Sequence, residues 1–62
     1  MCESNVYVTG EKGERLVMED AVLLEKKDGG VTVTNILGEQ IELQGEIEEI
    51  TFLEHRVLIR ES

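Results

Sequence analysis

The stretch LLEKKDGGVTV, residues 23–33, decides the fold of this chain. At its centre, Asp28-Gly29 is a favoured residue pair for a tight two-residue β-hairpin turn. With these two residues as the loop, the flanking side chains pair across two antiparallel strands. The expected pairs are Leu24 with Val33 and Lys26 with Val31 on one face, and Glu25 with Thr32 on the other. The stretch therefore predicts a half-buried antiparallel hairpin.

Gly38-Glu39 is a second turn signal, a candidate two-residue type II′ turn with glycine first. It sets Ile36 opposite Ile41. Ile36 then needs the face opposite to that of the valines in the first hairpin, because side chains alternate along a strand. We expect a bulge or sharp twist near Asn35 to resolve this conflict, since asparagine tolerates the left-handed conformation.

Glu54-His55 is the third turn signal. With these two residues as the loop, apolar pairs fall on one face of the hairpin and a charge pair falls on the other, as a two-layer sheet requires. The expected buried pairs are Phe52 with Val57 and Ile50 with Ile59. Leu53 and Leu58 are left on the outer side, where they are candidates for a partner surface.

The remaining segments complete a small β-domain. Asn5–Thr9 alternates and predicts the first strand, and Gly45 predicts a bend in a long strand that serves two sheets. Residues 14–27 favour a strand from Ala21 onward, with a short helical turn as the alternative before it. The fold class expected is all-β, with about five short antiparallel strands in a strongly bent SH3-like or Sm-like barrel.

The length predicts one small domain, residues 1–62, with a thin margin of stability. A chain of this size buries only about 60% of the surface that its unfolded form exposes. Small domains commonly need a disulfide, a metal or a partner subunit. A single cysteine excludes an internal disulfide, so we expect a homodimer.

The net charge of −8 repels phosphate backbones. The six basic residues are scattered, and one tyrosine and one phenylalanine supply no stacking platform, so nucleic-acid binding is disfavoured. The longest apolar run, 21–24, is far short of the roughly 20 residues that a membrane-spanning helix needs. The first ten residues lack the pattern of a secretory signal, and a lone thiol fits a reducing interior, so we expect a cytoplasmic protein.

The sequence offers few residues for a classical catalytic site, and we do not expect an enzyme. The two serines lie near the chain ends, at Ser4 and Ser62. Neighbouring carboxylates such as Glu48 and Glu49 alternate faces on a strand and do not converge on one substrate. A nucleophile pair of Cys2 and His55 is conceivable, because histidine can stabilise a thiolate.

Cys2 is the main candidate for metal binding. Removal of Met1, which is usual before a small residue, leaves a free amine, a thiolate and the Glu3 amide nitrogen within reach of one ion. Thiolate and nitrogen donors of this kind suit square-planar Ni(II) or Cu(II). The alternative is a frayed chain end without a role. Glu3 can add a carboxylate oxygen or simply face solvent.

His55 is either an exposed turn residue or a second ligand. Two cysteines and two histidines that converge across a dimer axis would form a tetrahedral zinc site, which is the main rival to the nickel hypothesis.

Four stretches of this sequence resemble the CooT-type family: 1–8, 17–22, 28–31 and 38–39. This family consists of short nickel-binding accessory proteins linked to maturation of carbon monoxide dehydrogenase, and some relatives carry an RNA-binding label. The resemblance implies a homodimeric small barrel that binds Ni(II) through Cys2 and the adjoining backbone nitrogens, including that of Glu3. It also implies carbon monoxide dehydrogenase as a client. An Sm-like nucleic-acid module and a protein-interaction module without metal are the alternatives.

Overall fold

The computed structural model describes residues 3–62, which form five strands. These are β1 (Ser4–Gly10), β2 (Gly13–Lys27), β3 (Gly30–Asn35), β4 (Gln40–Thr51) and β5 (Arg56–Glu61). The expected all-β class is confirmed for this part of the chain. The helical turn considered before Ala21 is wrong, because β2 is continuous across it. No helix in residues 3–62 is long and apolar enough to cross a membrane.

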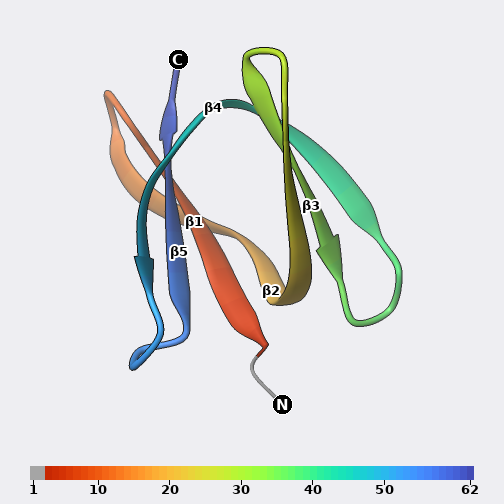
Figure 1. The fold of residues 1–62 in the computed structure, drawn as a ribbon. Coiled ribbons are helices and arrows are strands. Elements are labelled where there is room, and N and C mark those ends of the chain that lie inside the picture. The colour runs from red at the N-terminus through yellow and green to blue at the C-terminus, as the bar shows by residue number, and fades with distance from the viewer. Residues whose placement is uncertain (1–2) are drawn as a thin grey trace.

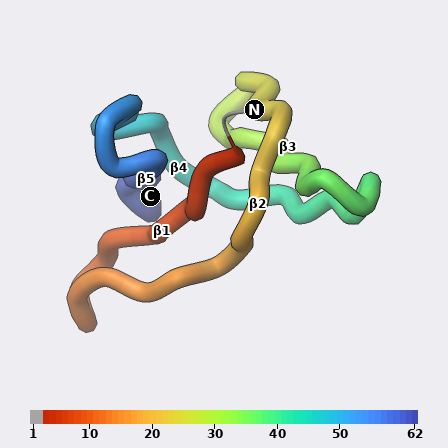
Figure 2. Tube along the Cα trace, turned by 90° about the horizontal axis from the view of Figure 1, so that it is seen from below, coloured from red at the N-terminus to blue at the C-terminus, as the bar shows by residue number. Residues whose placement is uncertain are grey.

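The strands close into a strongly bent ring rather than a regular barrel (Figures 1 and 2). Each strand pairs antiparallel with the next one, whereas β1 and β5 pair in parallel. The parallel pair corrects the fully antiparallel prediction. Its cause is the odd number of strands: the chain reverses at every turn, so the first and fifth strands run in the same direction.

Two long strands bend so that each serves two neighbours. In β4, residues 40–44 pair with β3 and residues 45–51 pair with β5. The bend lies at Gly45, as predicted, where a Cβ atom would stand only 2.1 Å from the carbonyl oxygen of Arg60. In β2, the change of partner lies around Asp20, whose φ is 57°. These bends close a ring with few strands.

The core is aliphatic and small. Among residues 3–62, it contains eight buried hydrophobic side chains: Val6, Val8, Met18, Ala21, Val31, Val33, Val57 and Ile59. The valines of β1 point inward as the alternation predicted, and so do the two core residues of β5. Half-buried leucine, isoleucine and valine side chains of β2 and β4 pack around this cluster.

The hairpin of β2 and β3 has the predicted register. Leu24 pairs with Val33, Glu25 with Thr32, and Lys26 with Val31. The hairpin of β1 and β2, in which Gly10 pairs with Gly13, was not predicted. The available signal was Gly13, whose φ of 97° favours glycine.

The β3–β4 turn is longer than the predicted two-residue turn. Ile41 pairs with Val33 instead of Ile36. Asn35 stabilises the longer turn, since its Oδ1 accepts hydrogen bonds from the backbone N–H groups of Leu37 (3.0 Å) and Glu39 (2.9 Å). The β2–β3 pairing is irregular between Ala21 and Leu23, opposite Asn35 and Thr34, in agreement with the irregularity predicted near Asn35. The extra residue lies on β2, and the longer turn gives Ile41 a different partner from the one predicted.

The β4–β5 turn is also longer than predicted and comprises Phe52–His55. Ile50 pairs with Val57, and Ile47 pairs with Ile59 after an irregularity in β4. The predicted burial of Phe52 is wrong, since its side chain is 83% exposed. The His55 N–H donates to the Phe52 carbonyl at 3.3 Å and closes the turn, so Phe52 lies in the turn and not in β4. The His55 carbonyl accepts a hydrogen bond from the Asn5 N–H of β1, at 2.8 Å.

Candidate metal centre

Cys2, the predicted metal ligand, lies outside the described residues. Glu3 is the first residue whose surroundings are defined, and it is half-buried immediately before β1. The structure therefore defines the segment that directly follows Cys2, which is Glu3 and the start of β1. The donor set itself, a thiolate with adjoining nitrogens, fits a square-planar Ni(II) ion by its chemistry.

The start of β1 is held on both sides by the ring. Ser4 pairs with Ala21 of β2, and Asn5 pairs with Arg56 of β5. The side chain of Val6, next along the strand, is completely buried. The chain thus enters an anchored strand at Ser4, only two residues after Cys2.

Arg56 ties the same three strands together. Its guanidinium contacts the Glu14 carboxylate of β2 and lies 3.9 Å from a carboxylate oxygen of Glu54. The same group stacks on the ring of Tyr7 in β1, 4.6 Å from its centroid. These contacts hold the β4–β5 turn against β1, close to the chain start.

Two turns with exposed apolar side chains flank the start of β1. The β3–β4 turn contacts β2 next to Ser4, since the Ile36 N–H donates to the Asp20 carbonyl at 2.9 Å. The β4–β5 turn lies on the other side, through the bond between Asn5 and His55. Figures 1 and 2 show the first strand beginning between these turns. They carry four exposed apolar side chains: Ile36, Leu37, Phe52 and Leu53.

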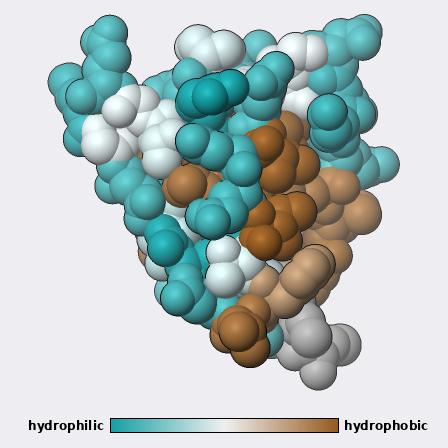
Figure 3. Space-filling model, turned by 60° about the vertical axis from the view of Figure 1, so that its left-hand side comes forward, coloured by the Kyte–Doolittle hydropathy of each residue, from teal (hydrophilic) through white to brown (hydrophobic). Residues whose placement is uncertain are grey.

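The polarity of the surface follows this arrangement. In Figure 3, apolar side chains gather over the centre and the lower right of the face, and polar side chains cover its top and its left side. The end of the ring at which β1 begins is therefore the more apolar end of this face.

His55, the rival ligand, is exposed in the β4–β5 turn, where its φ is 54°. The structure brings its backbone to Asn5 and so to the neighbourhood of the chain start. Within residues 3–62, no three side chains of histidine, cysteine, aspartate or glutamate form a group that could hold a metal ion. Glu48 and Glu49, both on β4, belong to no such group.

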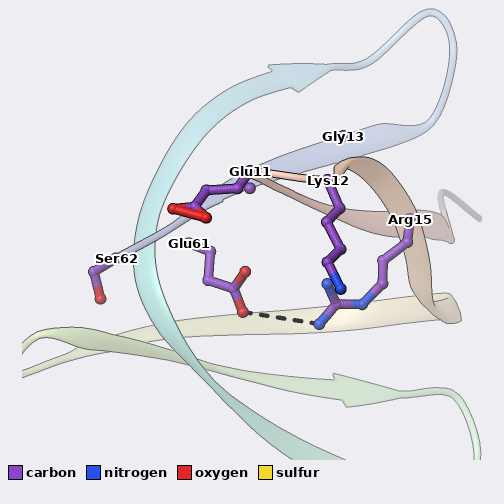
Figure 4. A pocket seen from close by; sticks show the side chains of 7 residues that line it. Glu11, Lys12, Gly13, Arg15, Glu61 and Ser62 are labelled. Atoms are coloured by element: carbon purple, nitrogen blue, oxygen red, sulfur yellow. Dashed lines mark ion pairs between the residues drawn. The ribbon is translucent and has the colours of Figure 1, made fainter.

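A pocket of about 440 Å³ lies at the other end of the ring, around the β1–β2 turn. Figure 4 shows Lys12, Arg15 and Glu61 at this pocket, and the Arg15 guanidinium lies 3.8 Å from the Glu61 carboxylate. The carboxylate offsets the positive charge of its partner. This pocket is thus separate from the start of β1, the strand that follows Cys2 in sequence.

Two known proteins are similar to this chain in sequence. An uncharacterised protein of Methanothermobacter thermautotrophicus is 39% identical over 59 residues, which cover 95% of this chain and 88% of that protein. An uncharacterised protein of Methanocaldococcus jannaschii is also 39% identical over 59 residues, covering 95% of this chain and 96% of the relative.

The fold matches a crystal structure of a protein assigned as CooT from Carboxydothermus hydrogenoformans. The TM-score is 0.89, with 98% of each chain covered and 23% sequence identity. The family model described as CO dehydrogenase accessory protein CooT matches residues 1–60, a range that includes Cys2. This chain therefore belongs to the CooT family of carbon monoxide dehydrogenase accessory proteins.

Proposed function

We propose that this protein binds Ni(II) through Cys2 and holds it for, or delivers it to, carbon monoxide dehydrogenase or a similar metalloenzyme. The observation that carries this proposal is the family match, which spans the sole cysteine at position two. An accessory role in the assembly of a metalloenzyme calls for a metal-binding group, and the chain start supplies one. The lone thiol favours a cytoplasmic location.

The proposed donors are the Cys2 thiolate, the terminal amine and the Glu3 backbone nitrogen. A terminal amine titrates well below lysine, so it becomes a neutral donor near pH 7 at modest cost. The anchored β1 limits the volume that these donors sample, because Ser4 and Asn5 are already paired in the ring. Pre-organisation of this kind lowers the entropic cost of binding an ion.

We further propose a homodimer in which the Cys2 residues of two chains share one ion. Each chain would supply its thiolate and one of its two candidate nitrogens, and these four donors would complete a square plane. Exposed apolar side chains on β2 and the β3–β4 turn support self-association: Val22, Leu23, Ile36 and Leu37. A partner subunit would also supplement a core of only eight buried hydrophobic side chains in residues 3–62.

Titration with Ni(II) tests the site. We expect thiolate-to-metal charge-transfer bands that saturate at one ion per two chains and vanish in Cys2→Ser. Two substitutions of Glu3 distinguish its carboxylate from its backbone nitrogen. Glu3→Gln keeps the backbone N–H and should still bind Ni(II), whereas Glu3→Pro removes the N–H and should weaken Ni(II) binding. Undiminished Ni(II) binding by Cys2→Ser would refute the assignment.

A second candidate function is a protein-interaction module without metal. The nearly complete exposure of Phe52 and Leu53 favours it. The two functions differ in thermal stability, because an ion that binds the native state raises the melting temperature by mass action. A melting temperature that Ni(II) leaves unchanged would favour the module without metal.

A further inference from the structure

The β4–β5 turn presents two adjacent apolar side chains to water. Phe52 is 83% exposed and Leu53 is 94% exposed, the two highest values among the large exposed hydrophobic residues of the described chain. Turns usually carry glycine, asparagine, aspartate or serine, whose conformational preferences suit them. The Phe-Leu-Glu-His sequence of this turn follows no such preference. Neighbouring exposed apolar side chains mark surfaces that other molecules cover.

The turn is held in one position. The His55 N–H donates to the Phe52 carbonyl at 3.3 Å, and the His55 carbonyl accepts from Asn5 at 2.8 Å. Arg56, the next residue, is fixed by the carboxylates of Glu14 and Glu54 and by the Tyr7 ring. Because the turn is ordered without a partner, a partner that binds it loses little conformational entropy.

The charge around the turn is negative. Arg56 is the nearest basic residue in sequence, and two carboxylates already contact its guanidinium. The other five basic residues of the chain lie towards the opposite end of the ring: Lys12, Arg15, Lys26, Lys27 and Arg60. A second copy of the chain would bring its own excess of carboxylates, whereas a basic surface would complement this one.

The turn also lies beside the start of β1. The hydrogen bond between Asn5 and His55 places its last residue against β1, three residues after Cys2. Transfer of a metal by ligand exchange requires the receiving protein to approach the donor atoms. The receiving protein must therefore pass close to this turn.

We infer that the β4–β5 turn is the recognition element for the metalloenzyme that receives the metal. Phe52 and Leu53 enter an apolar groove on that protein, and lysine and arginine side chains border the groove. The inference rests on the proposed function, because it identifies the bound partner as the acceptor of the metal. The apolar pair supplies the binding energy, and the carboxylates orient the approach.

The test uses the full chain, immobilised, and nickel-free carbon monoxide dehydrogenase as the probe in biolayer interferometry. The double variant Phe52→Ser/Leu53→Ser should weaken the Kd by about tenfold or more, as loss of a central apolar contact does. Leu16→Thr is the matched control, because it removes an exposed apolar side chain of β2 that lies outside the turn. We expect it to bind as the wild type does, and we expect added salt to weaken wild-type binding.

Three outcomes would overturn the inference: no binding by the wild type, equal binding by the double variant, or equal weakening by the control. A fourth outcome comes from light scattering, which measures the oligomeric state. If the wild type is a dimer and the double variant is a monomer, the turn serves self-association and the inference is wrong. Cys2→Ser separates the two proposals. It should still bind the enzyme while it loses Ni(II), so failure of metal binding and failure of enzyme recognition are read independently.

Discussion

Substitution of Gly45 by alanine should unfold much of the protein. Gly45 lies at the bend where β4 leaves β3 and begins to pair with β5. The added Cβ would lie 2.1 Å from the Arg60 carbonyl oxygen and 3.2 Å from the Cα of Glu61. Real Cβ contacts are essentially never closer than 3.0 Å, so the two strands must separate by about 0.9 Å, the difference between 2.1 and 3.0 Å.

The cost follows from the bonds at this point. Separation strains the pairs of Gly45 with Glu61 and of Glu46 with Arg60, and it weakens the hydrogen bond from the Ser62 N–H to the Gln44 carbonyl. Each hydrogen bond contributes about 0.5–1.5 kcal/mol, and backbone overpacking costs about 1–3 kcal/mol more. We expect a loss of about 3–5 kcal/mol, against a total of about 3–9 kcal/mol for a domain of this length.

Urea denaturation followed by far-UV circular dichroism, at fixed protein concentration, measures this loss. Gly38→Ala is the control, because Gly38 also has a positive φ, 86°, but no atom lies within 4 Å of the position that an added Cβ would take. The control should cost only about 1–2 kcal/mol, the penalty of a left-handed alanine. If Gly45→Ala is no less stable than Gly38→Ala, the close approach of β4 and β5 does not determine the stability of the ring.

Two further predictions concern the β3–β4 turn and the proposed metal site. Asn35→Ala removes the acceptor of the Leu37 and Glu39 N–H groups. It should lower the free energy of unfolding by about 1–2 kcal/mol in the same urea assay. An unchanged value would show that water replaces the side chain at no cost. Ni(II) affinity should fall on acidification by about tenfold per pH unit for each proton that the ligands must release, because protons compete for the thiolate and the nitrogens. Competition titrations at several pH values measure this, and a pH-independent affinity would contradict thiolate and amine coordination.

The local chemistry of the sequence was sufficient to predict several elements. Asp28-Gly29 determines the register of the β2–β3 hairpin, because a two-residue turn leaves only one pairing of the flanking strands. Alternation placed Val6 and Val8 in the core, and a glycine inside a long strand indicated the bend at Gly45. The sole cysteine at position two and the family resemblance came from the chain itself, and the family match confirms the resemblance.

The lengths of two turns were not predicted. The β3–β4 turn is longer than its Gly38-Glu39 pair suggested, because the Asn35 side chain bonds across the turn. The β4–β5 turn is closed by the hydrogen bond from the His55 N–H to the Phe52 carbonyl, which leaves Phe52 in the turn, where its side chain is exposed. Both turns are closed by hydrogen bonds between residues two to four positions apart, and asparagine is known to bond the backbone two residues further on. The signal for the longer β3–β4 turn was therefore Asn35 itself.

The sequence by itself determined the strand-forming pattern, the β2–β3 hairpin, the alternation along β1 and the sole cysteine at position two. Only the tertiary structure decided that β1 and β5 close the ring in parallel and that two apolar turns flank the chain start. The physical reason is the sequence separation over which each effect acts. Residue preferences and alternation act over a few positions, whereas ring closure joins strands about fifty residues apart through backbone hydrogen bonds that any side chain permits.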